Sequence, residues 1–209
     1  DQKGRWIIVM KKGKTVYGVS LGCAKNRVDS ERLLAVLEKR GFSLVSKPEG
    51  ADICIVNTCG FIQPAVEESI AAILDLLQLR DQGKVQKVGV VGCLLNRYKG
   101  DLQKELSEVD FWAVSEDIDS LLEGMQEAPV AALPTGRTLI PGQHSFTRYL
   151  KLVEGCDNKC TYCTIPAIRG SVRSLSVKQL VEEAQQLILS GAKELCLVGQ
   201  DLTVYGTDW

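Results

Sequence analysis

Short apolar runs alternate with amphipathic stretches through the first 124 residues, and this alternation restricts the fold more than any other feature. Four runs have the composition of buried strands, and four stretches have the spacing of helices. The expected strands are 15–21, 52–56, 87–91 and 111–114, and the expected helices are 29–40, 64–77, 101–108 and 116–124. This order predicts an α/β domain with a doubly wound parallel sheet and right-handed crossovers.

A second α/β unit is predicted beyond a stretch rich in proline and glycine. It has a strand at 149–153, a helix that Ser176 and Gln179 begin with a capping box, and a strand at 194–198. One such unit cannot bury its own sheet, so the second domain is expected to be incomplete. The predicted organisation is a leader or disordered segment at 1–14, a first domain at 15–124, a linker at 125–147 and a second domain at 148–209.

The composition is that of a soluble globular protein, with 45% apolar residues and a formal net charge of −1. There is no basic excess typical of nucleic-acid binding and no apolar run of membrane-spanning length, and the apolar stretch at residues 6–9 is too short for the core of a signal peptide. The eight cysteines are too few for a disulfide scaffold, which favours a reducing, cytoplasmic location and cysteines kept for metal or catalysis. Cys54 and Cys196 fall in mid-strand and are expected to be simply buried.

Three cysteines share one position in the first domain. Cys23, Cys59 and Cys93 each follow a predicted strand. All strands of a parallel sheet point the same way, so these thiols should emerge together at the carboxyl edge, where open α/β sheets bind ligands. A single cysteine is as well explained as a small buried residue, but three equivalent ones favour an iron–sulfur site. Structural zinc usually takes four ligands, and His144 in the linker is a poor candidate for the fourth.

A second trio, Cys156, Cys160 and Cys163, lies in one loop with three and then two intervening residues. Three thiolates converge there without a nearby fourth ligand. A four-iron four-sulfur cluster held by three thiolates keeps one iron open to bind another molecule. A zinc knot or an electron-transfer ferredoxin is the alternative, and ferredoxins have a different ligand spacing.

The second trio, with Tyr162 before its last cysteine, resembles the radical S-adenosylmethionine family. The resemblance implies the start of a (β/α) partial barrel, in which the open iron binds S-adenosylmethionine and electron transfer releases a 5′-deoxyadenosyl radical. It places Tyr162 and Gln200 at the cofactor. Arg169 and Arg173, in the segment after the loop, either neutralise a carboxylate or cluster charge or are solvated.

The two trios together resemble the radical methylthiotransferases, which carry two four-iron four-sulfur clusters. The motifs at 20–26, 28–31, 57–62, 67–70, 200–201 and 205–206 resemble the branch that modifies ribosomal protein S-twelve. That resemblance implies methylthiolation of the β-carbon of an aspartate in this protein of the small ribosomal subunit. It also implies an electron donor of the flavodoxin or ferredoxin kind, a sulfur donor and no membrane partner.

Two other functions stay open. The branch that modifies adenosine in tRNA usually has Gln-Met-Asn where this chain has Ala24-Lys25-Asn26. A non-catalytic iron–sulfur protein would need only one cluster and no S-adenosylmethionine. Iron counting separates the second alternative from an enzyme with two clusters.

Because the second domain is expected to be incomplete, these 209 residues alone should hold the amino-terminal cluster without turning over. Incubation of the reconstituted chain with S-adenosylmethionine and a reductant, followed by chromatography, should yield no 5′-deoxyadenosine. Clean production of 5′-deoxyadenosine would contradict this expectation.

Overall fold

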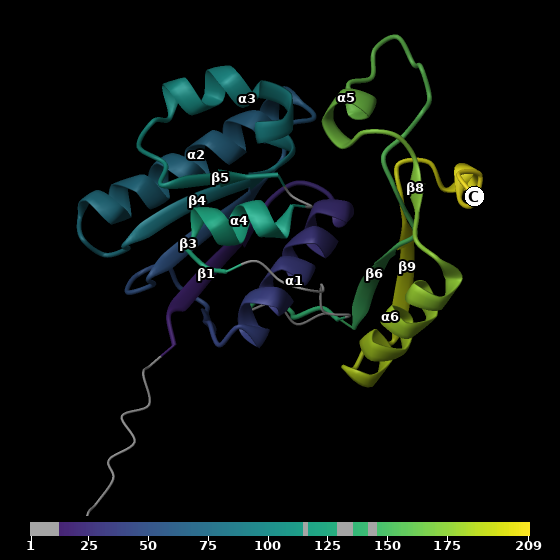
Figure 1. Ribbon diagram of the computed structural model, residues 1–209, viewed down its shortest axis with the longest axis horizontal. Helices are drawn as coiled ribbons and strands as arrows, with labels where there is room; N and C mark the ends of the chain where they lie inside the picture. Colours follow the sequence, from purple (N-terminus) through teal and green to yellow (C-terminus); the bar gives the residue numbers. More distant parts are fainter. Residues whose placement is uncertain (1–12, 115–116, 129–135, 142–145) are drawn as a thin grey trace, which may run out of the picture.

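The computed structural model describes residues 13–114, 117–128, 136–141 and 146–209 (Figure 1). These residues form a large parallel sheet with helices on both faces and a smaller second unit beside it. Residues 1–12 of the predicted leader, much of the predicted linker and His144 lie outside the described residues.

The large sheet has the strand order β2-β1-β3-β4-β5, and all its strand pairs are parallel. Its strands are β1 (Thr15–Ser20), β2 (Ser43–Val45), β3 (Ile53–Thr58), β4 (Lys87–Gly92) and β5 (Phe111–Ala113). The predicted doubly wound parallel sheet is confirmed, with β2 as an additional short edge strand. From β1 the chain winds first to β2 and then back across to β3, so a topological switch point lies between β1 and β3.

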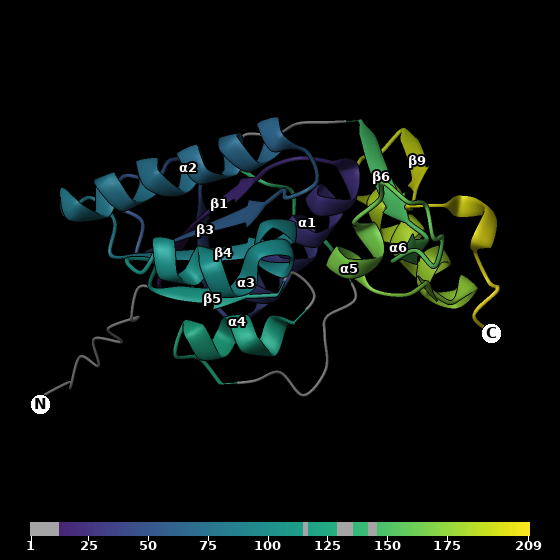
Figure 2. The same cartoon turned by 90° about the horizontal axis from the view of Figure 1, so that it is seen from above.

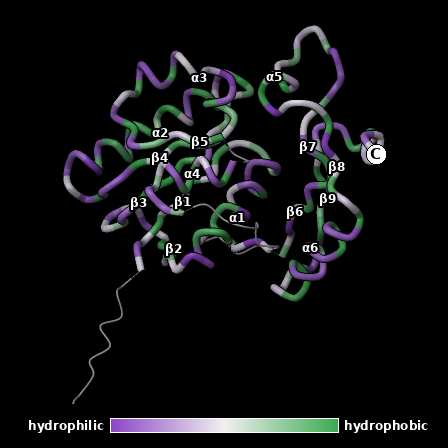
Figure 3. The backbone as a smooth tube through the Cα atoms, in the orientation of Figure 1, coloured by the Kyte–Doolittle hydropathy of each residue, from purple (hydrophilic) through white to green (hydrophobic). Residues whose placement is uncertain are grey.

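Helices cover both faces of this sheet (Figures 1 and 2). One core contains side chains of α1 (Ala24–Lys39) and α4 (Ile118–Gly124), and the other contains side chains of α2 (Gln63–Asp81) and α3 (Cys93–Glu105). Strand β3 contributes to both cores, because all six of its residues are buried. Figure 3 shows hydrophobic residues in the strands of the sheet and interspersed with hydrophilic ones along the helices beside it.

Two helices begin earlier than predicted, and both corrections bear on cysteines. Helix α1 begins at Ala24 rather than at residue 29, which makes Cys23 its N-cap. Helix α3 begins at Cys93 rather than at residue 101, and a non-helical Tyr98 kinks it. The apolar pattern failed in α1 because buried polar residues, including Asn26 and Asp29, interrupt it.

The second unit is built on the parallel pair β6 (Thr147–Lys151) and β9 (Glu194–Val198). Helix α6 (Val177–Leu189) connects them, and its predicted capping box is present. The predicted strand at 149–153 is wrong in its bounds, because the chain leaves β6 at Leu152 and forms β7 (Val153–Glu154). Strand β7 pairs antiparallel with β8 (Arg173–Ser174).

The segment between β7 and β8 contains the second cysteine trio and one short helix, α5 (Ile165–Arg169), which was not predicted. Its signal in the sequence is Pro166, since proline is favoured in the first turn of a helix. A short 3-10 helix, η1 (Leu202–Val204), follows β9. None of the described helices combines the length and apolar character needed to cross a membrane.

The centre of the sheet leaves no room for a side chain at Gly89 of β4. A Cβ there would lie 2.0 Å from two ring atoms of Phe111. Gly89→Ala should therefore lower the free energy of unfolding by about 1–3 kcal/mol, the usual cost of overpacking. Gly100→Ala is the matched control, because Gly100 lies in α3 with open space around its Cα, and alanine there should stabilise by up to about 1 kcal/mol. Urea denaturation of both variants measures the difference, and equal midpoints would contradict the packing described.

Candidate functional site

The structure brings Cys23, Cys59 and Cys93 together at the carboxyl edge of the large sheet. Cys23 caps α1, Cys59 directly follows β3, and Cys93 is the first residue of α3. The turn before Cys23 packs on Cys59: a Cβ at Gly22 would lie 2.5 Å from the Cys59 Cβ and 2.8 Å from its Sγ. Gly22 also has φ +83°, a left-handed conformation that other residues adopt only with strain. Cys23 and Cys59 thus flank the switch point of the sheet.

The surroundings of these thiols influence their ionisation in opposite directions. Burial raises the pKa of the Cys93 thiol, the nearby Arg169 guanidinium opposes that rise, and Cys59 and Cys23 add to it. The mutual influence of the three thiols reflects their proximity. Cys23 and Cys93 also lie at helix N-termini, where the helix dipole favours a thiolate. The backbone of Cys59 is fixed by Ser69 of α2, whose Oγ accepts from its N–H and donates to its carbonyl, both at 3.0 Å.

The second trio lies in a loop that is closed at its base. The backbone N–H of Cys156 donates to the carbonyl of Gly170 at 3.0 Å, and the Asp157 carboxylate accepts from the Val172 N–H at 3.3 Å. Gly155 has φ +72°, and a Cβ there would lie 2.0 Å from the Ser171 carbonyl oxygen. Cys156 is buried, Cys163 half-buried and Cys160 exposed. The loop therefore presents its later cysteines outward from a fixed base.

Tyr162 lies in this loop and Gln200 shortly after β9, and their predicted contact with a cofactor stays a prediction. Tyr162 is 87% exposed. The Asn158 side-chain amide in the loop donates to the Asp201 carboxylate at 2.9 Å, so the residue that follows Gln200 is attached to the cysteine loop. Of the cysteines outside the trios, Cys54 is fully buried as predicted, and burial raises the pKa of its thiol to about 12. Cys196 is only half-buried.

The donor sets fit an iron–sulfur cluster better than a single metal ion. Among the described residues, no three histidine, cysteine or acidic side chains converge closely enough to hold one ion. Sulfurs around zinc lie about 3.8 Å apart, which follows from Zn–S distances of about 2.3 Å in a tetrahedron. A four-iron cluster spreads its thiolate ligands more widely, one on each corner. Three cysteines in each trio would leave one corner of such a cluster without a cysteine ligand.

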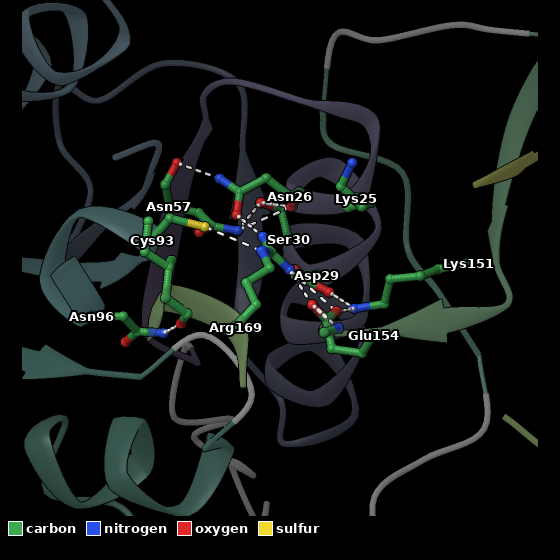
Figure 4. Close-up of polar contacts among 12 residues, drawn as sticks. Lys25, Asn26, Asp29, Ser30, Asn57, Cys93, Asn96, Lys151, Glu154 and Arg169 are labelled. Carbon is green, nitrogen blue, oxygen red and sulfur yellow. Dashed lines mark hydrogen bonds and ion pairs between the residues drawn. The ribbon is translucent and has the colours of Figure 1, made fainter. Parts of the chain in front are cut away.

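A buried group of four charged side chains joins the two units beside the first trio (Figure 4). Asp29 comes from α1, whereas Lys151, Glu154 and Arg169 come from β6, β7 and α5. Lys151 pairs with both carboxylates, and Arg169 Nη1 lies 3.0 Å from Asp29 Oδ2 and from Glu154 Oε1. Burial works to lower the pKa of Lys151, but Asp29 and Glu154 outweigh it and hold that pKa above its ordinary value.

A second buried group continues the contact further along α1. Arg148 of β6 donates to the Glu31 carboxylate at 3.0 Å, and Arg32 donates to Glu183 of α6 at 2.7 Å. Arg137 Nε lies 3.2 Å from Glu183 and 3.7 Å from Glu31. Ion pairs therefore join α1 to the second unit at several points along the helix.

Two cavities lie along the same boundary, one on each side of the first trio. The first, of about 230 Å³, has Cys23, Arg27 and Tyr149 in its wall. The second, of about 180 Å³, has Cys93, Asn96 and Glu154 in its wall. Each is lined by residues of both units, so the space beside the first trio belongs to the boundary between them.

The alternative that Arg169 is solvated is wrong, because the residue is 8% exposed. Asn26, Asp29, Lys151 and Glu154 were given no role from sequence. The signal for Asn26 and Asp29 was their spacing, i and i+3, in the first half of a helix that also buries Ser30 and Glu31. Such a polar stripe indicates that α1 packs on a polar partner as well as on the apolar face of its own sheet.

Comparison with known families supports this arrangement. The model described as "Uncharacterized protein family UPF0004" matches residues 15–114, which contain the first trio. The model described as "Radical SAM superfamily" matches residues 150–207, which contain the second trio. Each matched region therefore contains one of the two cysteine groups.

Curated relatives match almost the whole chain. A protein of Desulfotalea psychrophila named "Ribosomal protein uS12 methylthiotransferase RimO" is 43% identical over 202 residues, which are 91% of this chain and 45% of that protein. A protein of the same name from Myxococcus xanthus is 42% identical, over 93% of this chain and 43% of its own length. The chain thus spans less than half the length of these relatives.

Solved structures support the fold. TsrM from Kitasatospora setae, a radical S-adenosylmethionine methyltransferase solved with tryptophan substrate and a S-adenosylmethionine analogue, aligns with a TM-score of 0.63 at 13% identity. The alignment covers 92% of this chain and 49% of TsrM. At this identity the likeness shows a common architecture, an α/β sheet domain followed by the start of a radical S-adenosylmethionine domain. With two matched families and relatives of one name along more than nine-tenths of its length, the chain belongs to the radical S-adenosylmethionine methylthiotransferase family, in the branch of the RimO relatives.

Proposed function

We propose that the protein methylthiolates the β-carbon of an aspartate in ribosomal protein S-twelve, as an enzyme that transfers a sulfur-containing group. The observation that carries this proposal is the pair of cysteine trios, one in each matched family region. The names of the relatives, at 40–43% identity, supply the substrate. The small ribosomal subunit is the partner, and the reaction takes place in the cytoplasm.

Each trio holds one four-iron four-sulfur cluster in this proposal. Cys156, Cys160 and Cys163 hold the radical cluster, and Cys23, Cys59 and Cys93 hold the other. When bound, the radical cluster with S-adenosylmethionine supplies a hydrogen-abstracting radical, and the other cluster supplies the site for sulfur. An electron donor of the flavodoxin or ferredoxin kind and a sulfur donor complete the system.

The chain's own residues orient these parts. The loop that contains Cys156, Cys160 and Cys163, called the radical loop here, is fixed at its base by Gly155 and Asp157. The Asn158–Asp201 contact holds the segment around Gln200 against this loop. This placement supports Gln200 and Tyr162 as contacts to S-adenosylmethionine. Radical chemistry suits the substrate, because acid–base catalysis could not remove a proton from an unactivated β-carbon at neutral pH.

A ribosomal protein is favoured over tRNA by the charge of the chain. Binding to RNA phosphates draws on exposed lysines and arginines. The net charge here is −1, and Arg137, Arg148 and Arg169 are buried in ion pairs between the units. These arginines are therefore not available to phosphates.

Deletion of the gene should remove the methylthio group from S-twelve and leave tRNA unchanged. Intact-mass spectrometry of the ribosomal protein, with nucleoside analysis of tRNA from the same cells, measures both. A loss confined to tRNA would overturn the proposed substrate. Restoration by the wild-type gene, and not by a Cys160→Ser gene, is the matched control for cluster-dependent activity.

Substitution of one ligand in each trio should remove one cluster. Anaerobically reconstituted Cys59→Ser and Cys160→Ser proteins should each lose about half of the iron, since each trio holds four of eight irons. Cys196→Ala, outside both trios, should retain all of it. Iron and sulfide determination measures the result, and zinc in place of iron, or full iron in Cys59→Ser, would contradict the assignment.

A further inference from the structure

Arg169 connects the segment that carries the second trio to the first trio. It is the last residue of α5, six residues after Cys163, yet its side chain reaches Cys93 of the first trio (Figure 4). Its Nε donates to the Cys93 sulfur at 3.2 Å. The second unit, which carries Cys156, Cys160 and Cys163, is called the radical unit below. One of its residues thus donates to a predicted ligand of the cluster on the first trio.

The orientation of the Arg169 side chain is fixed by its other bonds. Nη1 donates to Asp29 and to both Glu154 oxygens at 3.0–3.1 Å, and Nη2 donates to the Asn26 side-chain oxygen at 3.1 Å. The guanidinium is planar and presents its donors in a rigid fork. With both Nη groups held, Nε can point only at Cys93.

Asn26 extends this contact to the other two cysteines. Its side-chain amide donates to the carbonyls of Leu21 at 2.8 Å and Thr58 at 3.1 Å. Leu21 precedes Cys23 by two residues, and Thr58 immediately precedes Cys59. Arg169 therefore bonds one thiol directly and, through Asn26, the backbones that carry the other two.

The contact acts on Cys93 through a hydrogen bond rather than through net charge. Asp29, Glu154, Lys151 and Arg169 sum to zero charge, so the group has little long-range field. Metal ligation requires Cys93 as a thiolate, and Cys93 is 7% exposed, so little water can solvate it. The Nε–H of Arg169 takes the place of that water.

We infer that Arg169 is a positioning residue of the amino-terminal cluster, whose bond to the Cys93 thiolate raises the reduction potential of that cluster. The inference rests on the proposed function, which puts a cluster on Cys23, Cys59 and Cys93. One-electron reduction adds negative charge to cluster and thiolates, so the hydrogen bond is stronger in the reduced state. Because Arg169 belongs to the radical unit, the potential depends on how that unit is docked.

The test compares two buried arginines that both pair with carboxylates of α1. Arg169→Gln removes the bond to Cys93, whereas Arg148→Gln breaks the ion pair with Glu31 and has no contact with a cysteine among its described bonds. Both are made in full-length protein whose Cys156, Cys160 and Cys163 are alanine, so that only the first cluster forms. Redox titration followed by electron paramagnetic resonance should show a more negative midpoint in Arg169→Gln and no shift in Arg148→Gln. Equal shifts in both, or none in Arg169→Gln, would overturn the inference.

A second measurement detects the nitrogen of the bound arginine directly. Protein with 15N-labelled arginine should show a 15N hyperfine coupling to the reduced cluster. Arg97, which donates to the Gly60 carbonyl at 2.7 Å, is another arginine near the trio and has no described bond to a cysteine, so Arg97→Lys should keep the coupling and Arg169→Lys should lose it. Absence of the coupling, or its loss in Arg97→Lys, would overturn the role of Arg169. Failure of any cluster to form on the intact trio would instead overturn the proposed function, and this inference with it.

Discussion

The buried contact of Arg169 and Lys151 with Asp29 and Glu154 is the interaction on which the relation of the two units depends. A buried charge costs several kcal/mol when it is unpaired, and removal of one partner typically costs about 3–5 kcal/mol. Here two cations and two anions pair in one group, and each cation lies against both anions. Displacement of the radical unit from α1 would leave Asp29 without its partners. Such a contact favours one docking geometry more strongly than an apolar interface of similar size, which tolerates sliding.

The position of this contact follows from the topology of the sheet. Parallel strands deliver Cys23, Cys59 and Cys93 to one edge, and α1 begins there, at the switch point beside β1. Asn26 and Asp29 lie in the first turns of α1 and so face the same edge. The radical unit reaches this edge with α5, at the end of the segment that carries its own cysteines. The same few residues thus contact the first trio and hold the segment that carries the second trio against α1.

Much of this arrangement was predictable from local patterns. The parallel sheet, the position of the three cysteines at its carboxyl edge and the Ser176–Gln179 cap each depend on residues close in sequence or on a general rule of topology. The start of α1 was not predictable, because Asn26 and Asp29 are polar where the pattern requires apolar residues. The pair of Asp29 with Arg169 joins residues 140 positions apart, and neither has a local signal that names its partner. The break of the strand at Leu152 likewise depends on a partner strand, β8, that is too short to be recognised alone.

The central claim is that six cysteines form two separate sites, each with one four-iron cluster, on either side of the Arg169 contact. Anomalous diffraction at the iron edge, from crystals of the anaerobically reconstituted protein, tests it most directly. We expect two distinct iron maxima, one among Cys23, Cys59 and Cys93 with Arg169 against it, and one among Cys156, Cys160 and Cys163. A single maximum, or a zinc signal at either site, would contradict the account.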